Sequence, residues 1–447
     1  MPEHFVIPPA VPTRVVRIGH GVLGEIPSVL SQVQVSPPAT CVIVADRRTF
    51  AAAGERVQTV VAGAGFDVRL YVLQDDTPGR VSGEAHQVRE VVDACGGHRG
   101  VLLGVGSGVV NDLGKLAARR TGMPYVAVPT AASMNGYGSP VAAIVQHGVK
   151  KTLPAAPTVA IVADLDVIAR APRDLARSGF ADLLSKATAT ADWTLAHLVR
   201  DEPYDPGPHE LLDPVVQRCM GLAAAIGDSD PGAIAVLMEG LIFGGFSMTL
   251  AGHSAPASGS EHLMSHLWDM QSQVSGGPHA LHGFQVAIGT RVVAALYERL
   301  LRLDARDIDV QRLRGTWRPW DQVRRDLKEA HGPLFGAVEP EAGKQHLQRD
   351  EFERELAVIR DRWEQIKQRV SPLLLSPRRL LELHRQAGVP TDPVCIGQSR
   401  ASVRHALLHA RDVRARFTVL DLATELGLLR PWADSLLDDA GLESRAT

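Results

Sequence analysis

The sequence predicts a Rossmann-like α/β domain with a parallel sheet at the N-terminus, followed by an all-helical domain. Short apolar, β-branched runs alternate with helix-length segments up to about residue 168. Strands that are apolar throughout are typical of a parallel sheet with helices on both faces. From about residue 171 the strand signal fades and helical patterns dominate. We therefore expect an α/β domain over residues 1–168 and a helical domain over residues 169–447.

The composition is that of a soluble, cytoplasmic protein. Hydrophobic residues make up 45% of the 447 residues, charged residues make up 22%, and the formal net charge is −3. Nothing in these values indicates a nucleic-acid partner or binding to an anionic membrane surface. We find no run of about 18 apolar residues and no signal peptide, so no membrane insertion is expected. The widely scattered cysteines favour reduced thiols over a disulfide framework.

Five apolar runs are expected to form strands, at residues 41–45, 67–73, 100–105, 125–129 and 159–163. Residues 82–95 and 109–120 lie between these runs and have the length of helices. Ligands of parallel sheets bind at the carboxyl ends of the strands. Polar or glycine-rich segments that directly follow a strand are therefore candidate binding segments.

A glycine-rich segment, Gly104-Val-Gly-Ser-Gly-Val-Val-Asn-Asp112, follows one predicted strand and opens a predicted helix. Glycines such as Gly106 and Gly108 let the backbone approach a pyrophosphate, and N–H groups at a helix start bind anions. The order of the glycines differs from the Gly-x-Gly-x-x-Gly fingerprint, so a plain strand-to-helix turn is the alternative. The position at the end of a strand favours phosphate binding.

Two further polar segments follow strands. Asp46 stands just past the first strand, where its carboxylate either accepts ribose hydroxyls, and then favours NAD over NADP, or only caps a helix. Residues 128–140 (Val-Pro-Thr-Ala-Ala-Ser-Met-Asn-Gly-Tyr-Gly-Ser-Pro) form a hydroxyl-rich loop that includes Asn135. This loop is either a simple turn cluster or a set of hydrogen-bonding groups for a polar ligand.

A long helix is expected from Gly179 through Trp193 toward Val199. Asp182 and Lys186 lie four residues apart and would share one face of this helix. A salt bridge between them is one interpretation. The flanking residues are apolar, however, and a carboxylate that faces the interior needs a partner, which a metal ion would provide.

Three histidines are candidate metal ligands. His262 and His266 are four residues apart and share a helix face, and His282 follows a bend that contains glycine and proline. Imidazole clusters suit a divalent transition metal. The pair alone is a weak signal, because a histidine on a helix is more often structural. The highly charged residues 304–370 predict solvated helices without an assigned chemistry.

Together these motifs resemble those of the iron-containing alcohol dehydrogenase superfamily, which includes glycerol dehydrogenase and dehydroquinate synthase. The resemblance is strongest to the glycerol-1-phosphate dehydrogenase branch. It covers about residues 15–300 in order and spacing, with a weaker likeness at residues 416–423. The segments that carry it are residues 104–112, 128–133, 150–155, 163–167, 179–186, 257–266 and 282–283.

The resemblance implies a dinucleotide-binding α/β domain, an all-helical domain and an active site in the cleft between them. It implies NAD or NADP, with NAD slightly favoured by Asp46, and one divalent metal held by Asp182, His262 and His282. His266 would line the substrate site. Either Lys186 or the pair Lys150 and Lys151 would meet a substrate anion, unless that pair is only an exposed basic loop. The residues expected to bind the nicotinamide cofactor are Asp46, Gly106, Ser107, Gly108, Asp112, Thr130, Ser133 and Ser139.

Four departures from the family pattern bear on the chemistry. Asn135 replaces a substrate-contacting aspartate, and its amide binds a hydroxyl but cannot act as a base. Lys186 replaces the fourth metal ligand of the iron enzymes, which leaves the three-ligand site typical of catalytic zinc, with nickel or iron as alternatives. Ala255 replaces an arginine and so removes a phosphate clamp. Phe284 stands where the branch often has a charged residue.

The leading hypothesis is a metal-dependent, NAD(P)-linked dehydrogenase that interconverts a small keto compound and its alcohol, with dihydroxyacetone phosphate reduction as the favoured reaction. The metal would act as a Lewis acid, and His266 would pass the proton to solvent. The alternatives are a dehydrogenase of an unphosphorylated or different polyol, a dehydroquinate-synthase-like lyase that uses NAD catalytically, and a non-catalytic scaffold. We expect a small-molecule substrate and a homo-oligomer.

Overall fold

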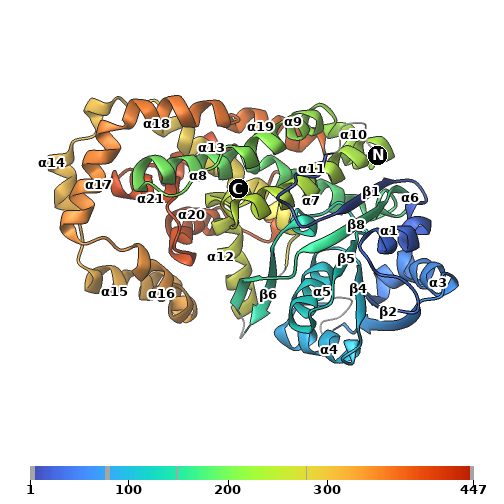
Figure 1. Ribbon diagram of the computed structural model, residues 1–447. Coiled ribbons are helices and arrows are strands. Elements are labelled where there is room, and N and C mark those ends of the chain that lie inside the picture. Colours follow the sequence, from blue (N-terminus) through green and yellow to red (C-terminus); the bar gives the residue numbers. More distant parts are fainter. Residues whose placement is uncertain (1–5, 76–80, 147–148, 278, 443–447) are drawn as a thin grey trace. The chain divides into compact units, whose positions relative to one another are not determined.

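The computed structural model describes residues 6–75, 81–146, 149–277 and 279–442 (Figure 1). Contacts within the chain divide it into two compact units. Unit 1 comprises Met1–Leu183 and Gly207–His253, and unit 2 comprises Leu184–Pro206 and Ser254–Thr447. Helical segments beyond residue 168 thus belong to both units, and the domain boundary expected at that residue stays a prediction.

Unit 1 is built on a six-stranded parallel sheet with the strand order β1-β8-β5-β4-β2-β3. In that order, the strands are Val15–Gly19, Thr158–Asp164, Tyr125–Val128, Gly100–Val105, Thr40–Asp46 and Asp67–Leu73. All five strands expected from the sequence are present, and the predicted parallel α/β sheet is confirmed. β1 was not expected because Arg17 interrupts its apolar run.

Helices cover both faces of this sheet (Figure 1). On one face, α1 (Ile26–Gln32) and α3 (Glu55–Gly63) bury Leu30 and Val57 against the strands in one core cluster with Ile43 and Leu103. On the other face, α4 (Ala85–Cys95) packs against α5 (Gly108–Thr121). Because both faces are covered, the inner strands β8, β5, β4 and β2 are buried along almost their whole length, whereas the edge strand β3 is largely exposed.

An antiparallel hairpin of β6 (Val141–Gln146) and β7 (Val149–Pro154) follows the sheet's fifth strand in the chain. It was not expected, because its lysine-containing second strand lacks an apolar run. The other helices of unit 1 are α2 (Arg47–Thr49), α6 (Leu165–Ile168), α7 (Arg173–Leu184), α9 (Gly207–Gly221), α10 (Ala223–Gly227) and α11 (Pro231–Ala251). The cysteines are all free, as expected.

α11 corrects one expectation. It has 21 residues with a mean hydropathy of 1.7 over its most apolar window, so it is long and apolar enough to cross a membrane, although no such run was expected. Of that window, 78% is buried inside the protein, which is also the property of a core helix. Glycines, alanines and Glu239 lie between the large apolar side chains of α11. For this reason the helix was not recognised in the sequence as one continuous apolar run.

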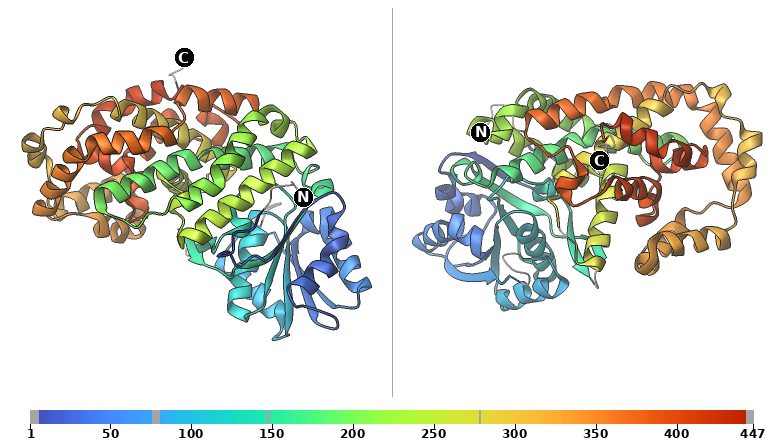
Figure 2. Two further views of the ribbon diagram at one scale, coloured as in Figure 1. Left: turned by 45° about the horizontal axis from the view of Figure 1, so that its top comes forward. Right: turned by 180° about the vertical axis from the view of Figure 1, so that it is seen from behind.

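The regular structure that is described in unit 2 is helical, which confirms the expected all-helical part (Figures 1 and 2). Its α-helices are α8 (Lys186–Arg200), α12 (Ser260–Ser275), α13 (His282–Leu300), α14 (Val310–Leu313), α15 (Trp320–His331), α16 (Phe335–Gln345), α17 (Arg349–Asp361), α18 (Trp363–Val370), α19 (Pro377–Gln386), α20 (Arg400–His409), α21 (Val419–Glu425) and α22 (Leu429–Asp439). The charged residues 304–370 form helices whose apolar stripes are buried, as Leu356 and Trp363 show.

The single helix expected from Gly179 toward Val199 is wrong, since the chain leaves helical structure at Ser185, between α7 and α8. Ser185 has φ −66 and ψ −12, a flattened ψ that ends the regular turn. The four-residue spacing of Asp182 and Lys186 crosses this interruption. The argument that the two side chains share one helix face therefore no longer holds.

Candidate active site

In unit 1, the loops after β4 and β5 lie side by side because these strands are adjacent and parallel. Gly106 and Ser107 lead from β4 into α5, which begins at Gly108. The hydroxyl oxygens of Ser107 and Ser133 are 2.5 Å apart. The backbone N–H of Thr130 donates to the Gly106 carbonyl at 3.4 Å. The structure thus brings these candidate residues together, and their contact with a cofactor stays a prediction.

Glycine is required for different reasons along this loop. A β-carbon at Gly104 would lie 2.1 Å from the hydroxyl oxygen of Tyr125, and one at Gly106 would lie 2.5 Å from Val110. These two glycines are needed for packing. At Gly108 a β-carbon would meet only Met134, at 3.9 Å. Internal packing does not explain that glycine, whereas a ligand that approaches the start of α5 would.

Lys115 supports the same region and could not be singled out from the sequence. Its buried ammonium donates to the carbonyls of Gly136 at 2.9 Å and Val141 at 2.7 Å, and to the Ser139 hydroxyl at 2.9 Å. Burial lowers the pKa of Lys115 to about 8, although the Asp112 carboxylate opposes this shift. Lys115 therefore positions Ser139. The sequence did contain one sign of this role, because Lys115 lies on the apolar face of the helix predicted at residues 109–120, where a charged group needs a partner.

The other polar residues of unit 1 have structural partners. Asp46 caps α2, and its carboxylate accepts the N–H groups of Arg48 and Thr49 at 2.8 Å each. This is the helix-cap alternative, and the ribose contact stays a prediction. The Asp112 carboxylate accepts the N–H of Ala143 in β6 at 3.1 Å. Asn135 precedes the short 3-10 helix η3 (Gly136–Gly138).

The candidate metal ligand Asp182 is a buried residue of α7 in unit 1.

The turn at Asn135 packs closely on α11, because a β-carbon at Gly245 would lie 2.7 Å from the Asn135 carbonyl oxygen. The glycines of α11 thus allow this turn to approach the helix. Their presence fixes the backbone of Asn135, one of the candidate substrate contacts.

In unit 2, the structure brings the three candidate histidines together. His262 and His266 lie on α12, and His282 opens α13. The ring centroids of His262 and His282 are 5.1 Å apart. The His266 ring lies 6.3 Å from each of the other two, measured between centroids. The sequence indicated that His262 and His266 share a helix face, but it could not show that His282 lies close to them.

Hydrogen bonds select the tautomer of both candidate ligands. The Nδ1–H of His262 donates to the buried Glu261 carboxylate at 2.8 Å. The hydroxyl of Ser265 donates to Gln285 at 2.7 Å, so its oxygen accepts from Nδ1–H of His282 at 3.2 Å. In both rings the lone pair is therefore on Nε2. Metal-ligating histidines are commonly held in this way, so the residues present fit a divalent ion.

Two buried carboxylates support α12. Asp192 accepts hydrogen bonds from the N–H and hydroxyl of Ser260, both at 2.7 Å, and from Tyr297 at 2.6 Å. Glu261 also accepts from the N–H of Gly259 at 2.8 Å. Burial opposes ionisation of Glu261, but the hydrogen bond and charge of His262 and the backbone hydrogen bonds of Gly259 and Glu261 together outweigh it and lower the pKa of this carboxyl. Burial and the nearby Glu261 charge raise the pKa of Asp192 to about 7.

Cationic groups converge on the segment before α12. Lys186 is buried, and its ammonium donates to the Ala257 carbonyl at 2.9 Å. The guanidinium groups of Arg414 and Arg416 donate to the Ser254 hydroxyl at 3.2 and 3.0 Å. Arg416 also donates to the Ser258 carbonyl. Burial and the Arg414 charge lower the pKa of Arg416 to about 10. Both arginines are about 160 positions from Ser254 in the sequence, so the sequence alone could not show that they contact it.

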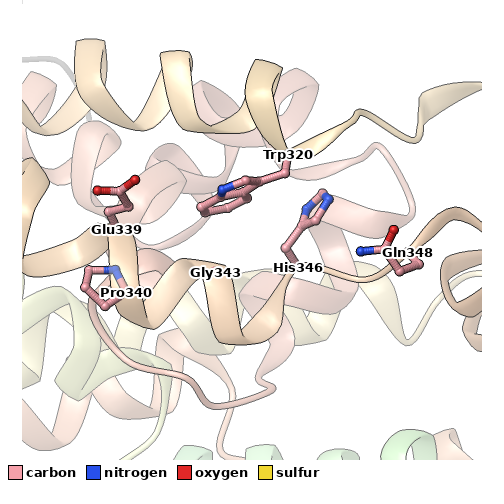
Figure 3. A pocket seen from close by; sticks show the side chains of 6 residues that line it. All are labelled: Trp320, Glu339, Pro340, Gly343, His346 and Gln348. Atoms are coloured by element: carbon pink, nitrogen blue, oxygen red, sulfur yellow. The ribbon is translucent and has the colours of Figure 1, made fainter.

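A separate pocket of about 460 Å³ lies in unit 2. Figure 3 shows the indole of Trp320 and the imidazole of His346 on its wall. Its lining residues are Trp320, Glu339, Pro340, Gly343, His346 and Gln348. The candidate site residues named above do not line it, and we assign it no function.

Comparisons with known proteins identify relatives of this chain. Residues 17–172 match the family model described as iron-containing alcohol dehydrogenase. The chain is 36% identical to the glycerol-1-phosphate dehydrogenase [NAD(P)+] of Halalkalibacterium halodurans over 58% of this chain and 65% of that relative. The aligned part thus spans less than two thirds of that relative's length. The enzyme of the same name from Staphylothermus marinus is 35% identical over 64% of this chain and 78% of that relative.

Solved structures share the fold. A glycerol dehydrogenase from Schizosaccharomyces pombe aligns over 97% of this chain and 93% of its own, with a TM-score of 0.59 at 15% identity. An iron-containing alcohol dehydrogenase from Thermococcus thioreducens aligns over 97% and 99%, with a TM-score of 0.60 at 16% identity. The chain belongs to the iron-containing alcohol dehydrogenase family, with relatives in its glycerol-1-phosphate dehydrogenase branch.

Proposed function

We propose that the protein is a metal-dependent, NAD(P)-linked dehydrogenase that reduces dihydroxyacetone phosphate to glycerol 1-phosphate and catalyses the reverse oxidation. The observation that carries this proposal is the pair His262 and His282, whose tautomers are fixed by Glu261 and Ser265. The names of the relatives, glycerol-1-phosphate dehydrogenase [NAD(P)+], support the substrate.

His262 and His282 would hold the metal through Nε2, and Asp182 would supply the third ligand. A carboxylate and two imidazoles suit zinc, while nickel and iron are compatible with the same donors. When bound, such an ion supplies Lewis-acid polarisation of the substrate oxygen. Glu261 acts as a positioning residue, because its hydrogen bond to Nδ1 orients the His262 ring and raises its basicity.

The nicotinamide cofactor would bind at the start of α5. The N–H groups that follow Gly108 are suited to its phosphates, and the neighbouring hydroxyls of Ser107, Thr130 and Ser133 offer hydrogen bonds. Asp112 and Ser139 would support this site through β6 and Lys115. Asp46 would meet the ribose through the carboxylate oxygen that does not cap α2, which slightly favours NAD over NADP.

The substrate phosphate would be met by cations of unit 2. Ala255 removes the arginine that the branch has at this position, but Arg414 and Arg416 both reach the adjacent Ser254. Two half-buried guanidinium groups that share one hydroxyl repel each other, and a bound phosphate would relieve this repulsion through charge-assisted hydrogen bonds. Lys186 would add a third cation. The pair of arginines thus compensates for the lost clamp.

The remaining residues would handle the hydroxyl and its proton. Asn135 would hydrogen-bond a substrate hydroxyl without taking its proton. His266, whose ring lies beside those of His262 and His282, would pass the proton to solvent. We further propose a small-molecule substrate, a cytoplasmic location and a homo-oligomeric assembly.

A substrate panel tests the function. The zinc-loaded protein is assayed with dihydroxyacetone phosphate and with dihydroxyacetone, each with NADH and with NADPH, by absorbance of the nicotinamide. We expect net oxidation of the cofactor and a kcat/KM at least about 100-fold higher for the phosphorylated ketone, since charge-assisted contacts to phosphate are strong. Activity on unphosphorylated ketones alone would refute the phosphate substrate. Turnover of any substrate without a net change in NADH would instead indicate a lyase.

A further inference from the structure

We propose that unit 2 holds a second metal site, formed by His331, His405, His409 and Asp412. The four side chains come from three elements that converge: α15 ends at His331, α20 carries His405 and His409, and the 3-10 helix η10 (Ala410–Val413) carries Asp412. They share no residue with the group around His262. The sequence did not suggest this site, because His331 lies far along the chain from the other three residues.

The distances fit a single ion. Nε2 of His331 lies 2.8 Å from Oδ2 of Asp412, and Nδ1 of His409 lies 3.7 Å from the same oxygen. One ligand atom from each of these three residues lies within 4.8 Å of the others. A tetrahedral zinc ion with bonds of about 2.0 Å sets its ligand atoms about 3.3 Å apart, which falls between the two measured separations.

His405 extends the group to four donors. It lies one helical turn before His409, and the centroids of the two rings are 4.7 Å apart. Its ring centroid is 6.2 Å from that of His331. Three imidazoles and one carboxylate form a donor set that zinc accepts in closed, four-ligand sites. Such a site lacks the open position that a catalytic metal needs, so its role would be structural.

The hydrogen bonding within this group is incomplete. Nδ1 of His331 and Nε2 of His405 are buried, and neither has a hydrogen-bond partner among the described residues. The His331 side chain is fully buried, and a buried polar atom without a partner is costly. An ion bound through Nε2 of His405 would give that buried atom a partner. It would not reach Nδ1 of His331, because it is Nε2 of that ring that faces Asp412.

The site would hold together a segment that matters for the substrate. η10 packs against α12, and Arg414 follows Asp412 by two residues. The carbonyl of Arg414 also accepts from Gln345 at 2.8 Å. A metal that joins α15, α20 and η10 would therefore restrain the backbone on which Arg414 and Arg416 are presented. This role rests on the proposed function, whereas the existence of the site does not.

Metal content is the direct test. Protein purified with zinc is analysed for metal per chain, and we expect about two equivalents in the wild type, one for each site. The variant His405→Gln/His409→Gln should retain about one equivalent, and so should Asp182→Asn/His262→Gln. His346→Gln is the matched control, since this histidine lies outside both groups, and it should keep both ions.

A thermal measurement separates the two sites. In the Asp182→Asn/His262→Gln protein only the second site can bind zinc, so added zinc should raise Tm by about 5 °C at saturation. Adding His405→Gln should abolish this rise. Cobalt, added alone to the metal-free Asp182→Asn/His262→Gln protein, should give the visible absorption of a tetrahedral ion, and the further change His405→Gln should remove this absorption. If Asp182→Asn/His262→Gln contains no zinc and shows no rise in Tm, the second site does not exist, whatever the enzyme's activity.

Discussion

Gly289 of α13 lies against the backbone of Glu261 of α12, so that a β-carbon at Gly289 would sit 2.8 Å from the Glu261 carbonyl oxygen. The two helices meet at this glycine. The contact places α13, which begins with His282, beside the helix that carries His262. Helix packing at a single small residue thus sets the distance between the two candidate ligands.

Gly289→Ala should therefore disturb the candidate metal centre. The added methyl group would push α13 away from α12, with an expected loss of about 1–3 kcal/mol in the free energy of unfolding. We also expect weaker zinc binding, measured by competition with a chelator. Gly336→Ala is the control, because a β-carbon at that helical position meets nothing within 4 Å. Unchanged zinc affinity in Gly289→Ala would show that this contact does not position His282.

Glu261→Gln tests the hydrogen bond to His262. The amide oxygen can still accept from Nδ1–H, but the negative charge that makes Nε2 more basic is lost. We expect zinc affinity to fall about 10–100-fold with little change in the KM for the nicotinamide cofactor. Glu239→Gln, which changes a buried carboxylate paired with Arg218 in unit 1, is the control and should keep zinc affinity. Equal losses in both variants would point to general destabilisation.

Arg416→Met tests the phosphate contact. We expect kcat/KM for dihydroxyacetone phosphate to fall about 100-fold, because a charge-assisted hydrogen bond to phosphate is lost. Activity on dihydroxyacetone should change little, and Arg416→Lys should recover part of the loss. Arg404→Met removes a partly exposed guanidinium paired with Asp434 and serves as the control. A parallel loss on both substrates would assign Arg416 to folding, which a measurement of Tm would detect.

Lys115→Met tests the buried ammonium and its pH dependence. The variant leaves the Gly136 and Val141 carbonyls without this donor, and we expect a loss of about 1–3 kcal/mol in the free energy of unfolding. The pKa of Lys115 is about 8 in the folded state, below its ordinary value of 10.5. Between these pH values the unfolded chain holds the proton more tightly, so wild-type stability relative to the variant should rise as pH increases.

Chemical denaturation of both proteins between pH 7 and about 10.5 provides the measurement. The exposed Lys151 offers the matched variant Lys151→Met, which is measured over the same pH range as a control for the loss of a lysine at the surface. A Lys115→Met difference that stays constant with pH would contradict the lowered pKa.

The sequence by itself determined five of the six strands of the parallel sheet, the loops that follow them and the pairing of His262 with His266 on one helix. These features are local, because apolar runs, glycines and four-residue spacing act within about ten residues. The sequence also carried the family motifs through which Asp182 and His282 were linked to the histidine pair.

Only the tertiary structure decided which distant groups support these residues. Arg416 reaches Ser254, Asp192 holds the N-terminus of α12, and Lys115 joins the turn at Gly136. Each contact joins residues that are at least 21 positions apart, and no local pattern records it. Burial is the physical reason, since a charged group placed in the core must find partners wherever the fold brings them.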